Sequence, residues 1–539
     1  MNSPCTPLRS GAALAALVLV VTACSPDGEP EPEPDGPEAE QITVDYPDGP
    51  FERTGVSGGT SRRLPSTMRV DEVVSYSDRT VLRMTLSPGG EDGDLHLTGD
   101  SFAGGMIGAN SRTPLGLRMI DPVGQALYVP AHEDGFVGSE MSAYVVGGVD
   151  YEVEAHFAPL PAGTRRVSVM VPGTQGAFSG MPVGDLSDQP WDPADAPTEE
   201  APSHWDVSSG ETVTFPVTDG EVPEAGLDLY GIVESTEVVR ETSATEHRVD
   251  LDADVLFDFD ESELTDEAAA TLDEVVAETR EKADPELPPI TIVGHTDGKG
   301  DDDHNGPLSE ARAEAVRAYL EEELGQDYEY ESEGRGSAEP VAEEGGDDDE
   351  EARARNRRVE ISYNILVEEE SERVGEEETV SARVGTGNIA APAPYVEASE
   401  EPLVTGEGVT MQGHEYGFSL YSLRRDGAFV VAEIDLTNES GRTVTSARGA
   451  AFWERGVQGG RFGSFGVQDP DSGDVYRSLR IGEAAGSDTE YLEPVGFPYL
   501  NDDGTTNRVH LYFPAPPLEV DTVTLKAGPF GEFEDLRLD

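Results

Sequence analysis

The chain has very little cysteine: only Cys5 and Cys24 occur among its 539 residues. Both lie near the start, where Arg9 precedes an apolar run, Gly11–Ala23. A run of 13 residues is too short to cross ~30 Å of hydrocarbon, and it therefore predicts a cleaved export signal over residues 1–23. Cys5 would be lost with that signal, so the mature chain would form no internal disulfide.

The three residues before Cys24, Val21-Thr22-Ala23, are small. They resemble the lipobox that lipoprotein signal peptidase cuts, although that family pattern usually has Leu where Val21 stands. The resemblance implies that Cys24 becomes the lipidated first residue of a membrane-anchored protein. Several acyl chains, at ~0.8 kcal/mol per buried CH₂, would give stable anchoring. An ordinary secretory signal with an incidental Cys24 is the alternative.

Basic residues are also scarce, with 36 Lys and Arg against 109 Asp and Glu and a formal net charge of −73. Nucleic acids and anionic lipid headgroups need a basic face, so this balance argues against both as partners. The acidic residues are spread over the whole chain. This distribution favours a solvated acidic surface, suited to a salty medium, over a surface that collects divalent cations.

The length predicts about three domains at ~150 residues each. Residues 24–40 alternate Pro with acids, which predicts an extended tether that has nothing to bury. Residues 41–237 and 401–539 contain short alternating strands between Gly and Pro turns, which predicts two mainly-β, immunoglobulin-like sandwich domains. Residues 368–400, rich in Glu and then in Ala and Pro, are predicted to be a linker.

The two predicted sandwiches share residues at matching intervals, which indicates a degenerate internal repeat. The matching sets are Asp121, Pro122 and Tyr128 with Asp469, Pro470 and Tyr476, and Phe157, Pro161 and Val167 with Phe513, Pro517 and Val523. Chance alignment of common strand residues is the alternative.

Residues 243–367 have a different periodicity, which predicts a two-layer α/β domain of order βαβαβ…β. Thr265 and Ser309 are candidate N-caps of its two helices, and Gly325 is expected to end the second. The predicted strands are Val249–Leu256, Ile290–Val293, Tyr328–Glu333 and Val359–Ile365. We expect one strand to lead into Asp297, and the second helix to carry Arg312.

One anion, Asp297, and one cation, Arg312, would thus lie at the mouth of this central domain. Arg312 can donate charge-assisted hydrogen bonds to a carboxylate, and Asp297 can balance an ammonium. The pair suits a ligand that has both groups on one carbon. A mutual salt bridge between Asp297 and Arg312 is the alternative.

The central segment resembles the OmpA-like peptidoglycan-binding domain over roughly a fifth of the chain. The motifs that match are Phe257-Asp258-Phe259, Gly294-His295-Thr296-Asp297-Gly298, Asn305, Leu308-Ser309-Glu310-Ala311-Arg312-Ala313, Val316, Tyr319-Leu320, Gly334-Arg335-Gly336, Pro340 and Asn356-Arg357-Arg358-Val359-Glu360. The resemblance implies that Asp297 and Arg312 grip diaminopimelate of the wall peptide. It also implies that Asn305 orders the loop and contacts the ligand, and that Arg357 or Arg358 lies close by.

Two acidic stretches depart from the family pattern. Asp301-Asp302-Asp303 could offer oxygen ligands to Ca²⁺, but the spacing of a calcium loop is missing, which favours a solvated turn. Residues 341–352 contain seven acids and are predicted to form a mobile loop.

These observations predict a non-catalytic cell-envelope lipoprotein that binds peptidoglycan and links membrane to wall, without cofactor or metal. We expect it on the outer face of a cytoplasmic membrane, or in the outer membrane of a diderm. An envelope scaffold is the alternative: its sandwiches would bind other envelope proteins, and its central domain would be only structural.

Overall fold

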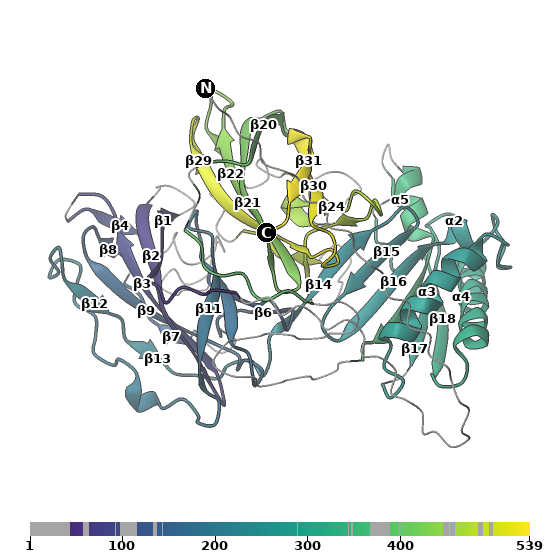
Figure 1. The fold of residues 1–539 in the computed structure, drawn as a ribbon, viewed down its shortest axis with the longest axis horizontal. Helices are drawn as coiled ribbons and strands as arrows, with labels where there is room; N and C mark the ends of the chain where they lie inside the picture. Colours follow the sequence, from purple (N-terminus) through teal and green to yellow (C-terminus); the bar gives the residue numbers. More distant parts are fainter. Residues whose placement is uncertain are drawn as a thin grey trace, which may run out of the picture. The chain divides into compact units, whose positions relative to one another are not determined.

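The computed structural model describes residues 44–57, 64–91, 93–97, 116–132, 137–142, 144–287, 289–342, 344–345, 349–366, 389–397, 399, 401–445, 452, 459–482, 489–494 and 500–539. Figure 1 shows these residues as a coloured ribbon. The predicted signal and tether, with Cys24, lie outside them. No helix in the described ranges has both the length and the apolar character needed to cross a membrane.

The first β module, residues 51–218, is built from short strands, as the sequence predicts. Strands β1, β2, β3 and β9 pair antiparallel in that order. Strand β11 pairs parallel with the second half of β2 and antiparallel with β10, which continues to β5 and β6. Apolar side chains of these strands form one buried core. The elements are β1 Phe51–Ser57, β2 Leu64–Tyr76, β3 Thr80–Pro88, β4 Leu95–Leu97, β5 Arg118–Asp121, β6 Ala126–Tyr128, β7 Gly138–Ser139, β8 Tyr144–Val146, β9 Asp150–Phe157, β10 Arg166–Met170, β11 Ala177–Leu186, the 3-10 helix η1 Pro193–Asp195, β12 Thr212–Thr214 and β13 Val217–Thr218.

The second β module, residues 404–539, has a sheet of order β20-β21-β22-β29 and a second set of paired strands, β25-β24-β30-β31. A separate apolar core, rich in Phe, lies between these two sets. The elements are β20 Val404–Val409, β21 Glu415–Asp426, β22 Phe429–Asn438, β23 Val444–Thr445, η2 Gly460–Phe462, β24 Phe465–Gln468, β25 Val475–Tyr476, β26 Arg480–Ile481, β27 Glu490–Tyr491, β28 Leu500–Asn501, β29 Thr506–Pro514, β30 Thr522–Ala527, η4 Gly528–Phe530 and β31 Glu532–Arg537.

The two β modules repeat the same strand pairings, which confirms the internal repeat predicted from the sequence. Met119 pairs with Tyr128 in the first module, and Val467 pairs with Tyr476 in the second. Both modules also shift register at the same two places. The shifts lie between Val70 and Glu72 and between Val167 and Val169 in the first module, and between Leu420 and Ser422 and between Val523 and Leu525 in the second.

The central α/β unit, residues 238–366, lies between the modules in sequence and contains the long helices. Its sheet has the order β15-β16-β19-β17-β18, in which only β17 and β18 are parallel. Helices α3 and α4 pack on each other, and α4 packs on β17 and β18 (Figure 1). The elements are β15 Val238–Thr242, β16 Glu246–Asp252, α2 Ala253–Leu256, α3 Ala268–Lys282, β17 Ile290–His295, α4 Asp302–Leu324, β18 Tyr330–Gly336, α5 Asp349–Asn356 and β19 Arg358–Asn364.

Helix α4 begins seven residues before the predicted cap, Ser309, so that prediction is wrong. Asp301 caps the helix instead, because its side chain accepts the His304 N–H at 3.1 Å. Acids in the first turn also suit the positive end of the helix dipole. Ser309 is buried, and its hydroxyl accepts the Gly336 N–H at 2.9 Å, which ties α4 to the end of β18.

Two further expectations for this unit need correction. The strand expected over Val249–Leu256 ends at Asp252, because the Asp252 side chain accepts the Asp254 N–H and begins α2. The expected loop 341–352 is helical from Asp349 onward. Thr265 does contribute to the start of the first helix, since its hydroxyl accepts the Ala268 N–H at 3.1 Å.

Strand β14, Leu227–Glu234, joins all three parts of the chain. It pairs with β6 of the first module, with β25 and β26 of the second, and with β15 of the central unit. The two modules also share a buried apolar cluster that includes Ile120, Met170, Phe429 and Tyr512. Residues 389–397, part of the predicted linker, contact both modules: Tyr395 packs in the first core, and the Ala393 N–H bonds Asp426.

Candidate functional site

Asp297 follows an interior strand of the α/β unit, β17, by two residues. The strand β17 pairs with β18 on one side and β19 on the other, and Ile290, Ile292 and Val293 are buried within it. A Cβ on Gly294 would lie 2.0 Å from the Ser309 carbonyl oxygen, so the glycine lets α4 approach the strand closely. This approach brings the Arg312 side of α4 to the end of the strand that precedes Asp297.

Arg312 is buried, yet no ion pair involves it among the residues that the structure describes. Its Nε donates to the Glu261 carbonyl at 2.9 Å, and its guanidinium carbon lies 5.1 Å from the centre of the Phe257 ring. Burial lowers the pKa of Arg312 below its ordinary value, while the nearby carboxylates of Asp254, Asp260 and Asp297 oppose this shift. The contacts hold the guanidinium in place without neutralising its charge.

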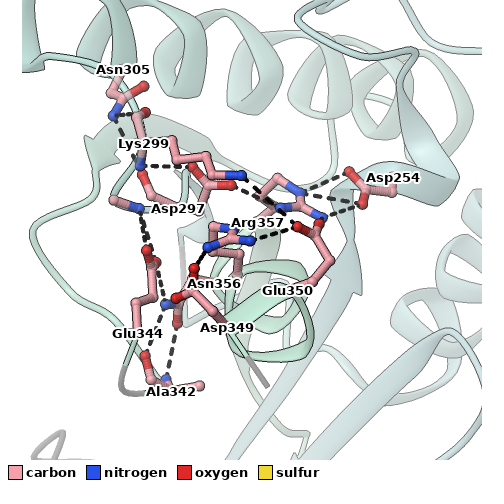
Figure 2. Close-up of polar contacts among 12 residues, drawn as sticks. Asp254, Asp297, Lys299, Asn305, Ala342, Glu344, Asp349, Glu350, Asn356 and Arg357 are labelled. Carbon is pink, nitrogen blue, oxygen red and sulfur yellow. Dashed lines mark hydrogen bonds and ion pairs between the residues drawn. The ribbon is translucent and has the colours of Figure 1, made fainter. Parts of the chain in front are cut away.

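Asp297 pairs with Arg357 and not with Arg312. One Arg357 Nη donates to Asp297 Oδ2 at 2.8 Å, and the Lys299 N–H donates to Asp297 Oδ1 at 3.0 Å. Figure 2 shows the two side chains facing each other at the centre of the site. Asp297 is 9% exposed, so its carboxylate is largely withdrawn from water and depends on these donors.

Arg357 is held by three carboxylates. In addition to Asp297, it donates to both oxygens of Asp254, the shortest contact being 2.7 Å, and to Glu350 at 3.2 Å (Figure 2). Hydrogen bonding to Asp254 is the largest influence and raises the pKa of Arg357 above its ordinary value. Arg357 thus links Asp254, Asp297 and Glu350, and Glu350 also pairs with Arg353 at 2.7 Å.

Asn305 orders the loop that follows Asp297. It lies in the first turn of α4, is buried, and donates to the backbone carbonyls of Asp297 at 3.3 Å and Lys299 at 3.0 Å. These bonds fix the loop between β17 and α4, which is the structural role that the family resemblance implies.

Arg358 belongs to a different environment from its neighbour Arg357. Side chains alternate across a strand, and Arg358 is buried beside His295, Asp250 and Glu360, with ion-pair distances of 3.6 Å and 3.7 Å to the two acids. Burial lowers the pKa of Arg358 below its ordinary value. The structure therefore brings Asp297, Asn305, Arg312 and Arg357 together and places Arg358 in a separate buried cluster.

Three residues that shape the site were not predicted from the sequence: Asp254, Glu344 and Glu350. Asp254 lies in a run that resembles a strand, and the two glutamates lie in the acidic stretch predicted to be a loop. Their only signal was an abundance of acids, which is common throughout this chain. No group of His, Cys, Asp and Glu within the described ranges is arranged to hold a metal ion.

Residues 256–357 match the model of the OmpA family, and this segment of the chain is an OmpA-like domain. The match includes Asp297, Asn305, Arg312 and Arg357. The fold and the site thus define the class of the central unit, while both β modules lie outside the matched segment.

Similar proteins share this domain rather than the whole chain. Outer membrane protein A of Bordetella avium is 40% identical over 114 residues, which cover 21% of this chain and 56% of that protein. Photosystem I P700 chlorophyll a apoprotein A2 of Gloeobacter violaceus is 37% identical over 114 residues, which cover 21% of this chain and only 13% of that protein. The peptidoglycan-associated lipoprotein of Burkholderia pseudomallei, a crystal structure, has 30% identity and a TM-score of 0.16, with 20% of this chain and 86% of that chain covered.

Proposed function

We propose that the chain is a non-catalytic cell-envelope protein whose OmpA-like domain binds the peptide stems of peptidoglycan. The observation that carries the proposal is the buried guanidinium of Arg312, which no carboxylate of the described residues neutralises, beside the buried carboxylate of Asp297. The free end of diaminopimelate has an ammonium and a carboxylate on one carbon. Its carboxylate would take charge-assisted bonds from Arg312, and its ammonium would bind Asp297.

The electrostatics of the site suit a ligand that brings both charges. Asp254 and Asp297 share Arg357, whereas the Arg312 guanidinium has no ion-pair partner among the described residues. An ammonium at Asp297 and a carboxylate at Arg312 would answer both charges. No step of this binding cleaves the peptide, in keeping with a wall-anchoring role and not an enzymatic one.

The rest of the proposal concerns how the protein is held in the envelope. Cys24 would be lipidated and residues 24–40 would form the tether, so the anchor would hold one end at a membrane while the central domain grips the wall. The two β modules would be immunoglobulin-like sandwiches that act as spacers or bind other envelope proteins. Their shared apolar cluster and the pairing of β14 support a role in holding the central domain at a fixed place.

Co-sedimentation of the full chain with diaminopimelate-type sacculi tests the proposal. Asp297→Ala and Arg312→Ala should each weaken binding by about 2–5 kcal/mol, because each leaves one charge of the ligand pair without a partner. Asp303→Ala and Arg317→Ala are matched controls, since Asp303 is exposed in the first turn of α4 and Arg317 pairs with Glu314 and Glu321. Equal pelleting of all variants, or of none, would contradict the proposal and favour the scaffold alternative.

A further inference from the structure

The chain places one of its own carboxylates on a backbone donor next to Asp297. Both oxygens of Glu344 accept the Gly298 N–H, at 2.9 Å and 3.1 Å, and Glu344 Oε1 also accepts the Asn356 Nδ2–H at 2.8 Å. Figure 2 shows Glu344 below Asp297, with Asn356 beside it. Two neutral donors therefore form a small carboxylate subsite, which Glu344 occupies.

The donors of this subsite are fixed without help from Glu344. Asn356 is fully buried, and its Oδ1 accepts the backbone N–H groups of Val341 and Ala342 at 2.9 Å each. Its Nδ2 also donates to the Ala342 carbonyl at 2.9 Å. Gly298 follows Asp297, whose carboxylate is anchored by Arg357 and by the Lys299 N–H. Removing the Glu344 carboxylate should therefore leave both donors of the subsite in position.

Glu344 itself is weakly held for a carboxylate so close to another anion. Across the part of the chain that the structure describes, no ion pair involves Glu344, and its donors are a backbone amide and a side-chain amide. Neither donor carries a formal charge, so these bonds are weaker than those of an arginine–carboxylate pair. A carboxylate of a ligand already bound at Asp297 and Arg312 can therefore displace Glu344 and accept the same hydrogen bonds from Gly298 and Asn356.

We infer that Glu344 is an internal occupant of a second carboxylate subsite, and that a further carboxylate of the bound stem peptide displaces it. The inference rests on the proposed function, because the ligand is the same peptide. Arg312 takes the carboxylate of diaminopimelate, and the Gly298 and Asn356 donors take the carboxylate at the end of the peptide. The peptide can use the subsite only in molecules from which Glu344 is absent. Its apparent affinity is therefore reduced to that fraction of the intrinsic affinity.

A double-mutant cycle between protein and ligand tests this inference on the full chain. The ligands are two diaminopimelate-containing stem peptides that differ only at the C-terminus, one with a free carboxylate and one with a carboxamide. Glu344→Ala should bind the free-carboxylate peptide about 3- to 10-fold more tightly than the wild type. The gain should disappear with the carboxamide peptide. Glu351→Ala is the matched control, because Glu351 is an exposed acid of α5 and its loss makes the same change in net charge.

The outcomes separate this inference from the proposed function. If both peptides bind in an Asp297-dependent manner but Glu344→Ala gains no more than Glu351→Ala, the inference is overturned and the wall-binding site stands. An equal gain for the carboxylate and carboxamide peptides would also overturn it, because only relief of negative charge would then be at work. If neither peptide binds any variant, the proposed function itself is wrong.

Discussion

The two β modules place an acid opposite a basic side chain at the same cross-strand position, with the acid on opposite strands. In the first module, Arg83 of β3 lies opposite Glu154 of β9, and its Nε donates to that carboxylate at 2.8 Å. At the matching place in the second module, Glu433 of β22 lies opposite His510 of β29, and it also accepts from Arg508 at 2.8 Å. The repeat thus preserves an acid facing a basic side chain across the strands, although the two residue types exchange strands.

The pairs differ in what surrounds them. The side chains of Arg83 and Glu154 are 34% and 8% exposed, whereas those of His510 and Glu433 are 1% and 2% exposed. The second pair is covered by the first module: Arg53 of β1 lies 3.9 Å from Glu433, and Gly176 approaches His510. The comparison teaches that contact between the modules, and not the repeated fold, buries the basic member of the pair as well as its acid.

The largest expected effect comes from removing the anion of the buried pair. Glu433→Ala should lower the free energy of unfolding by about 3–5 kcal/mol, because the buried Arg53 would lose its anion, while Arg508 keeps its pair with Asp435. The matched change, Arg83→Ala, should cost about 1 kcal/mol or less, since water reaches Arg83 and Glu154 keeps its contact with His156 at 2.7 Å. Urea unfolding of both variants at neutral pH measures the difference. Similar losses in the two variants would show that burial between the modules does not govern these pairs.

The turn before β11 in the first module and the matching turn before β31 in the second give the next test. Gly176 has φ +78° and Gly531 has φ +91°, and their carbonyls accept equivalent backbone bonds from Val171 and Ala527. An alanine in this left-handed region costs about 1–2 kcal/mol at either place. At Gly176 the new Cβ would also lie 2.0 Å from His510 Nδ1, whereas at Gly531 nothing lies within 4 Å.

Gly176→Ala should therefore lose about 1–3 kcal/mol more than Gly531→Ala, the usual cost of overpacking. Thermal unfolding of the two variants side by side measures this extra loss. A second substitution, His510→Ala, should recover most of it in the Gly176 variant by making room for the methyl group. Without such recovery, the contact between the modules would not explain the difference.

The sequence predicted the features that depend on local pattern. Shared residues at fixed intervals indicated the repeat, and the buried run Ile290–Val293 indicated the strand that leads to Asp297. The position of Arg312 beside that strand followed from a helix that packs back on it. These features need only periodicity and chain order, which the sequence contains.

Other features depend on long-range pairing, which one sequence does not reveal. Whether Arg357 or Arg358 lies in the site depends on the pairing of β19 and on where α5 ends. The same two features make Arg357 the partner of Asp297. The contacts of β14 with three parts of the chain join residues far apart in sequence, as do those of Ala393 and Tyr395. Glu344 was indistinguishable from the other acids until Asn356 placed it beside Gly298.

Lowering the pH should destabilise the protein through protonation of His510. Burial lowers the pKa of His510 to about 4, with Arg53 and Arg424 acting in the same direction and Glu433 opposing them. Between about pH 6.5 and pH 4, His510 is protonated in the unfolded chain but not in the folded protein. The free energy of unfolding therefore falls as the pH is lowered through this range. Glu433, whose pKa is lowered to about 2, extends the loss below pH ~4.5, where its carboxylate is protonated more readily in the unfolded chain than in the folded protein.

The size of the His510 contribution can be isolated by comparison with His510→Gln. Between pH 7 and pH 5, the wild type should lose about 2 kcal/mol more of its free energy of unfolding than this variant. Urea unfolding at both pH values measures the difference. The matched position in the first module is Glu154, so a Glu154→Gln variant should keep the full loss from His510. An identical response of the wild type and His510→Gln would mean that His510 takes up its proton in the folded protein, and that the second pair is less buried than its contacts with the first module indicate.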